Sequence, residues 1–127
     1  MGVRCLIVDD NPGFLQVARE ILESGGIVVV GVASTSAEAI SRTLEAGPDV
    51  ALVDVALVAE SGFDLARRLV AQRGSRRTQV IMISTRAEED FAEVIAASPA
   101  IAFLPKWELS AAAVERLLRR AAQRDAG

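Results

Sequence analysis

The stretch VRCLIVDD, residues 3–10, decides the fold. An apolar run without polar alternation is typical of a strand buried on both faces of a parallel sheet. Asp9 and Asp10 end this run, and Asn11 followed by Pro12 predicts the start of a helix, with Asn11 as its cap. The chain therefore opens with a strand and a helix that meet at two carboxylates.

The same alternation continues to the end of the chain. Apolar strands are predicted at residues 3–8, 27–34, 49–55, 79–84 and 101–104. Helical spacing of apolar residues follows each strand: from Pro12 to Gly25, from a cap at Thr35 or Ser36 to Gly47, over 61–73, over 88–97, and onward from a cap at Ser110. Five strands alternating with five helices predict an α/β fold, a doubly wound parallel sheet covered on both faces.

Within this scheme the second helix has a predicted buried face. Ala37, Ile40 and Leu44 recur at helical spacing, so we expect them to point toward the sheet. The single cysteine, Cys5, lies in the first strand and should be a small buried core residue. One cysteine allows no intrachain disulfide, which fits a reducing cytoplasm.

Composition excludes several function classes. The 127 residues suit one domain, and the net charge of −3 argues against binding nucleic acid through general positive charge. No apolar run reaches the length of a membrane span, and the start of the chain shows no secretion signal. The chain has no histidine, which removes Ser-His and Cys-His catalysis and His-ligated zinc.

Polar side chains follow four of the predicted strands. They are Asp9 and Asp10 after the first, Asp54 at the end of the third, Ser84 at the end of the fourth, and Lys106 after the fifth. Parallel strands bring their carboxyl ends to one edge, where open α/β sheets bind ligands. Clustered carboxylates call for a cation, and Mg²⁺ prefers such oxygen ligands. A lysine and a hydroxyl beside them suit phosphoryl oxygens.

This constellation resembles the receiver domain of two-component response regulators, which is CheY-like. The resemblance covers the whole chain, residues 1–127, and rests on DD ending the first strand, LVDV ending the third, SG eight residues after Asp54, MIST ending the fourth and FLPK ending the fifth. It implies a flavodoxin-like sheet of strand order 2-1-3-4-5. It also implies a cytoplasmic protein that receives a phosphoryl group from a sensor histidine kinase.

The resemblance implies a role for each site residue. Asp54 would be the phosphoacceptor and, with Asp10 and the backbone carbonyl of Ala56, a ligand of Mg²⁺. Asp9 would act on the metal through water. Ser84 and Lys106 would hold phosphoryl oxygens. The domain would then be a phosphoacceptor that assists its own phosphorylation and dephosphorylation, not an enzyme acting on other substrates.

The resemblance also implies a switch. The Ser84 hydroxyl would move toward the phosphoryl group, and the ring of Phe103 would turn inward. The face made by the fourth helix, fifth strand and fifth helix would change shape and control an output, with transcription as the expected one. The chain would be a complete regulator or the amino-terminal part of a longer one with a DNA-binding output domain, and a homodimer is one arrangement.

Some residues depart from the family pattern. Val58 stands where proline is common, Ala56 bears on the dephosphorylation rate, and Thr85 could narrow access for small phosphodonors. These departures leave open a pseudo-receiver, a binding module that works without phosphorylation. A magnesium-dependent phosphatase is disfavoured, because it would need an acid two residues after Asp54 and Ala56 cannot serve.

Basic residues form two clusters with two interpretations. They are Arg67, Arg68, Arg73, Arg76 and Arg77 in and after the third helix, and Arg116, Arg119, Arg120 and Arg124 in the last helix. A charged stripe is usually a solvated helix face. Alternatively, the arginines of the last helix pair with acidic residues across a dimer interface. Trp107 could pack on the last helix or lie at a partner surface.

Overall fold

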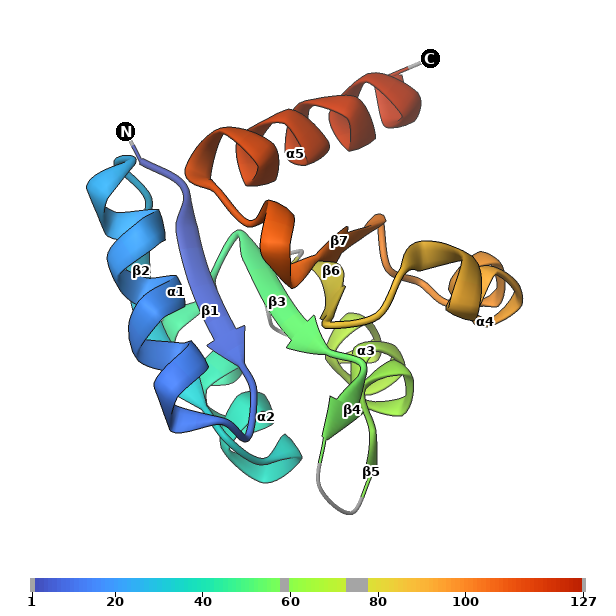
Figure 1. The fold of residues 1–127 in the computed structure, drawn as a ribbon, viewed down its shortest axis with the longest axis horizontal. Coiled ribbons are helices and arrows are strands. Elements are labelled where there is room, and N and C mark those ends of the chain that lie inside the picture. The colour runs from blue at the N-terminus through green and yellow to red at the C-terminus, as the bar shows by residue number, and fades with distance from the viewer. Residues whose placement is uncertain (1, 58–59, 73–77, 127) are drawn as a thin grey trace.

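A computed structural model describes residues 2–57, 60–72 and 78–126 of the chain (Figure 1). Its main sheet has five parallel strands in the order β2-β1-β3-β6-β7. They are β1 (Arg4–Val8), β2 (Val28–Ala33), β3 (Val50–Asp54), β6 (Gln79–Ser84) and β7 (Ala102–Pro105). In chain order this is the arrangement 2-1-3-4-5, so the predicted doubly wound α/β fold and its strand order are confirmed.

The helices follow the strands as predicted, and side chains cap their starts. They are α1 (Pro12–Ser24), α2 (Ser36–Ala46), α3 (Gly62–Ala71), α4 (Ala92–Ala97) and α5 (Ala111–Ala126). Asn11 accepts hydrogen bonds from the first turn of α1, and Thr35, not Ser36, caps α2. The Ser61 and Ser110 hydroxyls accept from Phe63 and Ala113. Such caps satisfy amide groups that a helix leaves without intrahelical partners.

The sheet separates two hydrophobic cores. On one face Ile7, Leu52 and Ile83 pack with residues of α1 and α5, including Leu22 and Val114. The other face packs against α2 and α3, and its core reaches the segment around α4. Cys5 is fully buried in the first core, as predicted, and burial raises the pKa of its thiol to about 12. Because both faces are covered, β1 and β3 read as continuous apolar runs.

The predicted buried face of α2 is wrong at two of its three positions. Ala37 and Leu44 are exposed, Leu44 at 55 %, and only Ile40 packs against the core. The buried positions are Ser36, Ala39 and Thr43, and the Thr43 hydroxyl donates to the Ala39 carbonyl at 2.7 Å. That hydrogen bond satisfies the hydroxyl and lets a polar residue face the sheet, which apolar spacing alone does not reveal.

Two segments near the carboxyl edge differ from the expected pattern. The predicted helix over 88–97 begins as a 3₁₀ turn, η1 (Glu88–Phe91), before α4. After β3 the chain forms an antiparallel ribbon of β4 (Ala56–Leu57) and β5 (Glu60–Ser61) where a loop was expected. The ribbon extends beyond the end of β3 (Figure 1). Val58 and Arg73, which the sequence singled out, lie outside the described residues.

None of the described helices is long and apolar enough to cross a membrane. The described arginines of the two basic clusters are exposed, as a solvated helix face requires. Arg67 pairs with Asp64 at 2.8 Å, and Arg124 donates to the Ile101 carbonyl at 3.1 Å. Arg76 and Arg77 lie outside the described residues.

Candidate functional site

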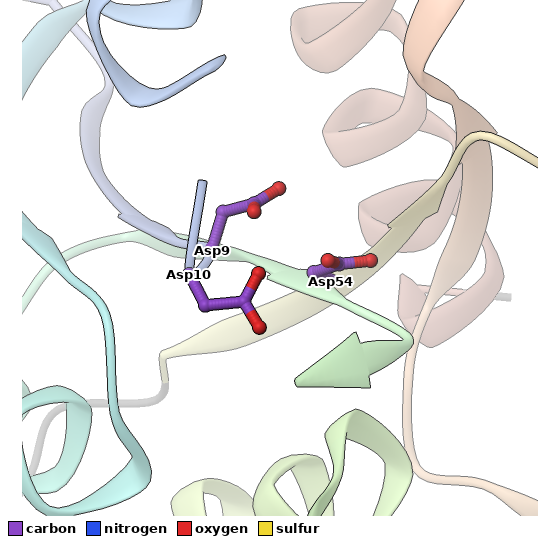
Figure 2. A group of neighbouring side chains, drawn as sticks. All are labelled: Asp9, Asp10 and Asp54. Carbon is purple, nitrogen blue, oxygen red and sulfur yellow. The ribbon is translucent and has the colours of Figure 1, made fainter. Parts of the chain in front are cut away.

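Three carboxylates meet at the carboxyl edge of the sheet. Asp9 and Asp10 follow β1, Asp54 ends the neighbouring β3, and one oxygen of each lies within 4.8 Å of the others (Figure 2). The parallel pairing of β1 with β3 aligns Val8 with Val53, so both chains reach the edge at the same level. The sequence prediction that these residues gather is therefore correct in geometry.

Asp54 is buried in an environment that disfavours its charge. The residue is 7 % exposed, and the pKa of its carboxyl is raised, first by burial and then by the negative charge of Asp9. The charge of Lys106 and a hydrogen bond from the Ala56 amide act in the opposite direction. Additional positive charge at the site would therefore stabilise the ionised form of the Asp54 carboxyl.

Lys106 links the ends of β1 and β3. Its Nζ lies 2.5 Å from Oδ2 of Asp9 and 3.6 Å from Oδ2 of Asp54, and its side chain is 13 % exposed. It is the only lysine in the chain. Lys106 follows β7 directly and opens the 3₁₀ turn η2 (Lys106–Glu108), so the strand end aims it across the sheet edge.

Asp9 is held at both oxygens. The residue is fully buried; Oδ1 accepts from the Asn11 amide at 2.9 Å, and Oδ2 accepts from Lys106. Asp10 is only partly buried and has further interactions. Both carboxylate oxygens of Asp9 thus accept hydrogen bonds, whereas Asp10 is the more exposed of the two residues.

Ser84 lies on the other side of Asp54. Asp54 pairs with Ile83, so Ser84 is one residue beyond it on the adjacent strand. Ser84 is buried, and its hydroxyl oxygen accepts from the Arg86 amide at 3.0 Å. The hydroxyl hydrogen is not used by that bond, so Ser84 keeps a donor at the sheet edge.

The ribbon after β3 presents the Ala56 backbone to the site. The Gly62 amide donates to the Val55 carbonyl at 2.9 Å, and Ala56 is the next residue, opposite Ser61. In an antiparallel ladder the pair next to a hydrogen-bonded pair exchanges no hydrogen bonds. Among the described residues of the ribbon, this register gives the Ala56 carbonyl oxygen no ladder hydrogen bond, and a backbone carbonyl is a type of ligand that hard cations accept.

Three rings lead away from the site toward β7. Phe91 of η1 lies 6.2 Å from Phe63, at the start of α3, and 5.9 Å from Phe103 of β7, measured between ring centroids. The Arg86 guanidinium lies 5.7 Å from the Phe91 centroid. Phe103 is buried in this row, so its ring points inward in this structure. Trp107 is 64 % exposed, which leaves it free for a partner surface.

Comparison with known proteins identifies this arrangement. The family described as the response regulator receiver domain matches residues 5–118. The chain belongs to the receiver domain family. It is thus a receiver domain of two-component signalling, as the sequence resemblance indicated.

The matched region makes up a different share of each relative. A protein-glutamate methylesterase/protein-glutamine glutaminase of Haloarcula marismortui is 35 % identical over 89 residues, which are 70 % of this chain and 23 % of the relative. The chain thus spans about a quarter of that relative's length. The signal receiver domain of a modulated diguanylate cyclase from Desulfovibrio desulfuricans is 27 % identical with a TM-score of 0.79, covering 98 % of this chain and 96 % of that one.

A third relative shares the fold at lower identity. A response regulator protein from Burkholderia pseudomallei, solved with a phosphorylated aspartic acid, a calcium ion and citrate, is 22 % identical with a TM-score of 0.77. The match covers 98 % of this chain and 71 % of that chain.

The donor set of this receiver domain fits a hard divalent cation. Three carboxylates with converging oxygens lie at the ends of β1 and β3, and the Ala56 amide donates to one of them, Asp54. Oxygen ligands of this kind are those that Mg²⁺ takes, usually with waters completing the octahedron. Asp54 in particular is a buried carboxyl whose ionisation a nearby cation would favour.

Two contributors to this edge were missed from the sequence. Asn11 was recognised only as a cap, yet its amide also fixes Asp9. Phe91 lies within the helix predicted over 88–97, and its ring joins Phe63 to Phe103. The Asp-x-Asn spacing could have indicated the first, because Asp side chains commonly accept from the amide two residues on. Nothing in the sequence indicated the second.

Proposed function

We propose that this receiver domain is a phosphorylation-activated switch in which Asp54 accepts a phosphoryl group from the phosphohistidine of a sensor kinase. The observation that carries the proposal is the position of Asp54. Its buried carboxylate ends β3 with two further carboxylates in reach and a lysine ammonium 3.6 Å away. A structural residue has no need of such neighbours, whereas a phosphoacceptor uses all of them.

In the transfer, a carboxylate oxygen of Asp54 attacks phosphorus. A P–O bond forms, the bond from phosphorus to the imidazole nitrogen of the donor breaks, and the electron pair stays on that nitrogen, which becomes protonated. The chain contributes position and charge rather than a base, which is consistent with its lack of histidine.

The neighbouring residues would stabilise the phosphoryl oxygens. The Lys106 ammonium would move from Asp9 onto one oxygen, and the Ser84 hydroxyl would donate to another. Asp10, Asp54 and the Ala56 carbonyl would hold Mg²⁺, with Asp9 acting through a water. When bound, the cation neutralises the carboxylates and the incoming phosphoryl charge.

The output surface of the proposal adjoins the ring row. Phe103, Pro105 and Trp107 line a groove of about 390 Å³ with residues of η1 and α5. A Ser84 hydroxyl drawn toward the phosphoryl group would change the packing behind it, and Phe103 would pass that change to the groove. An output domain, a partner protein or a second copy would bind there, with transcription as the predicted output.

Intact mass after incubation with acetyl phosphate and Mg²⁺ tests the proposal. We expect a single phosphoryl adduct that is stable in acid and labile in base, absent in Asp54→Asn and retained in Asp64→Asn, an exposed carboxylate of α3. Failure of a matched kinase to produce the adduct would rule out the switch and favour the pseudo-receiver. Beryllofluoride with Mg²⁺ should also change the fluorescence of Trp107, the only tryptophan.

A further inference from the structure

The ring of Phe14 faces the lysine of the site. Nζ of Lys106 lies 4.2 Å from the Phe14 ring centroid, which is within the range of a cation–π interaction. The same ammonium contacts Asp9 and Asp54. An ammonium has three N–H donors. Here two carboxylates and one ring face lie within reach of them.

The backbone of Phe14 is connected to Asp9 through Asn11. Asn11 donates from its amide to Asp9 and accepts from the Phe14 amide at 3.2 Å. Asp9 in turn accepts from Lys106, which lies over the Phe14 ring. These contacts connect four residues: Asp9 after β1, Asn11 and Phe14 at the start of α1, and Lys106 after β7. The first turn of α1, which carries the ring, is therefore connected to both Asp9 and Lys106.

A ring is suited to a lysine that must move. A third carboxylate would hold the ammonium in a direction set by its oxygens and offset its charge. A ring face attracts a cation over a broad area and leaves its charge intact. Lys106 can therefore shift from Asp9 toward an oxygen near Asp54 and remain over Phe14. The partly buried ring also packs against the core under α1 and α5, so it is a stiff platform.

We propose that Phe14 is a positioning residue for Lys106. Its ring holds the ammonium within reach of Asp54 and supports its transfer from Asp9 to a phosphoryl oxygen. This inference rests on the proposed function of Asp54 as phosphoacceptor. It adds a residue outside the acidic cluster, from the first turn of α1, to the groups that set the rate of phosphoryl transfer.

The first test is spectroscopic. Because Lys106 is the only lysine, ¹⁵N-lysine labelling yields one side-chain ammonium signal. We expect upfield ring-current shifts of the Lys106 side-chain protons in the native protein. Phe14→Tyr should keep these shifts and Phe14→Leu should remove them. Val17→Ala is the control, because Val17 lies on the same helix and is 51 % exposed. Circular dichroism verifies that each variant folds.

The second test is kinetic and uses the same variants with acetyl phosphate and Mg²⁺. Loss of the ring face should slow adduct formation in Phe14→Leu by about threefold to tenfold, the range expected for a partly buried cation–π contact. Phe14→Tyr should remain within about twofold of the native rate, since its ring offers the same face. A native rate in Phe14→Leu would overturn the inference, whether or not the ring-current shifts are lost.

Different results would contradict the proposed role of Asp54 as phosphoacceptor and the proposed role of Phe14 in positioning Lys106. If the native protein takes up no phosphoryl group from any donor, the proposed function fails. The placement of Lys106 by Phe14 is then judged by acetylation of its amine with acetic anhydride, measured by peptide mass. Removing the ring should raise that acetylation severalfold in Phe14→Leu and leave it unchanged in Phe14→Tyr. Equal acetylation of the native protein and Phe14→Leu would overturn the inference.

Discussion

The ring of Phe91 lies 5.9 Å from the ring of Phe103, tilted by 36°. Phe91 belongs to η1, which follows β6, and Phe103 belongs to the neighbouring strand β7. Phe91 also contacts Phe63 on the opposite side. The helix that starts beside Asp54 and the strand that ends at Lys106 are thus joined by one side chain. η1 has no buried residue of its own, so we expect the contacts of the Phe91 ring with Phe63 and Phe103 to help hold it in place.

Removal of that ring should loosen η1. Phe91→Ala is expected to lower the free energy of unfolding by about 1–2 kcal/mol, through lost aromatic contacts and partial burial. Val94→Ala on α4, where Val94 is 42 % exposed, should change it by less than about 0.5 kcal/mol. Urea unfolding measures both. Equal effects of the two changes would show that the ring row does not anchor this segment.

Charge at Asp54 should oppose folding when no cation is added. The folded chain holds the Asp54 proton to a higher pH than the unfolded chain does, because burial and Asp9 raise its pKa above 3.8. The stability from this group is therefore present at low pH and lost as the pH rises through the folded pKa. In EDTA near pH 7.5, Asp54→Asn should raise the free energy of unfolding by about 1 kcal/mol.

The stabilisation of Asp54→Asn relative to the native protein should shrink as the pH falls, because the native Asp54 carboxyl is then protonated. Asp64→Asn provides the comparison, because Asp64 is exposed and pairs with Arg67. Urea unfolding at several pH values measures the effect. A stabilisation of Asp54→Asn that is the same at low and neutral pH would contradict this electrostatic explanation.

Magnesium should stabilise the native protein. A ligand that binds only the folded state adds about 1.4 kcal/mol at ten times its dissociation constant. We expect a rise in melting temperature with millimolar Mg²⁺ and little rise in Asp10→Asn, since Asp10 is a partly buried carboxylate of the acidic cluster. Differential scanning calorimetry with and without EDTA measures this. An equal rise in Asp10→Asn would place the binding elsewhere.

Gly62 should tolerate no side chain. A Cβ at this position would lie 1.9 Å from the Asp54 carbonyl oxygen, so β3 and the start of α3 would have to separate. Gly62→Ala is expected to cost about 3 kcal/mol or more, as backbone shifts in a packed region do. Gly31→Ala on β2 is the control, because its Cβ would make ordinary contacts at 3.5 Å. Chemical unfolding compares the two, and similar values would disprove the expectation.

The thiol of Cys5 should be inert while the protein is folded. Burial raises its pKa from 9.0 to about 12, so the folded state disfavours the thiolate. The corresponding stability is present below pH 9.0 and is lost as the pH rises through about 12. A disulfide reagent near pH 8 should label one thiol only after unfolding in urea. Rapid labelling of the folded protein would contradict the predicted burial.

The strands were predictable because burial on both faces leaves a strong signal. β6 agrees with its prediction residue for residue, β1 differs by one residue at its start, and the other three sheet strands differ by one residue at each end. Once the strands were known, parallel pairing implied that Asp9, Asp10 and Asp54 would meet. The helix caps at Asn11 and Ser110 were equally local, since a cap acts within three residues of itself.

The buried face of α2 shows where the sequence was insufficient. Apolar spacing favoured Ala37 and Leu44, but the helix is turned so that Ala39 and Thr43 face the sheet. The hydrogen bond from the Thr43 hydroxyl to its own helix makes that burial possible. The hydrophobic pattern of a single helix cannot show which of two weakly apolar faces the neighbouring layer selects.

The sequence by itself determined the order of strands and helices, the strand ends that carry Asp9, Asp10, Asp54, Ser84 and Lys106, and through them the family. These features depend on periodicity and local hydrogen bonds, which act over a few residues. Only the tertiary structure decided that Lys106 lies over Phe14 while bound to Asp9, and that Phe91 joins Phe63 to Phe103. Such contacts depend on side chains from distant segments meeting at set distances, and those distances exist only once the layers have packed.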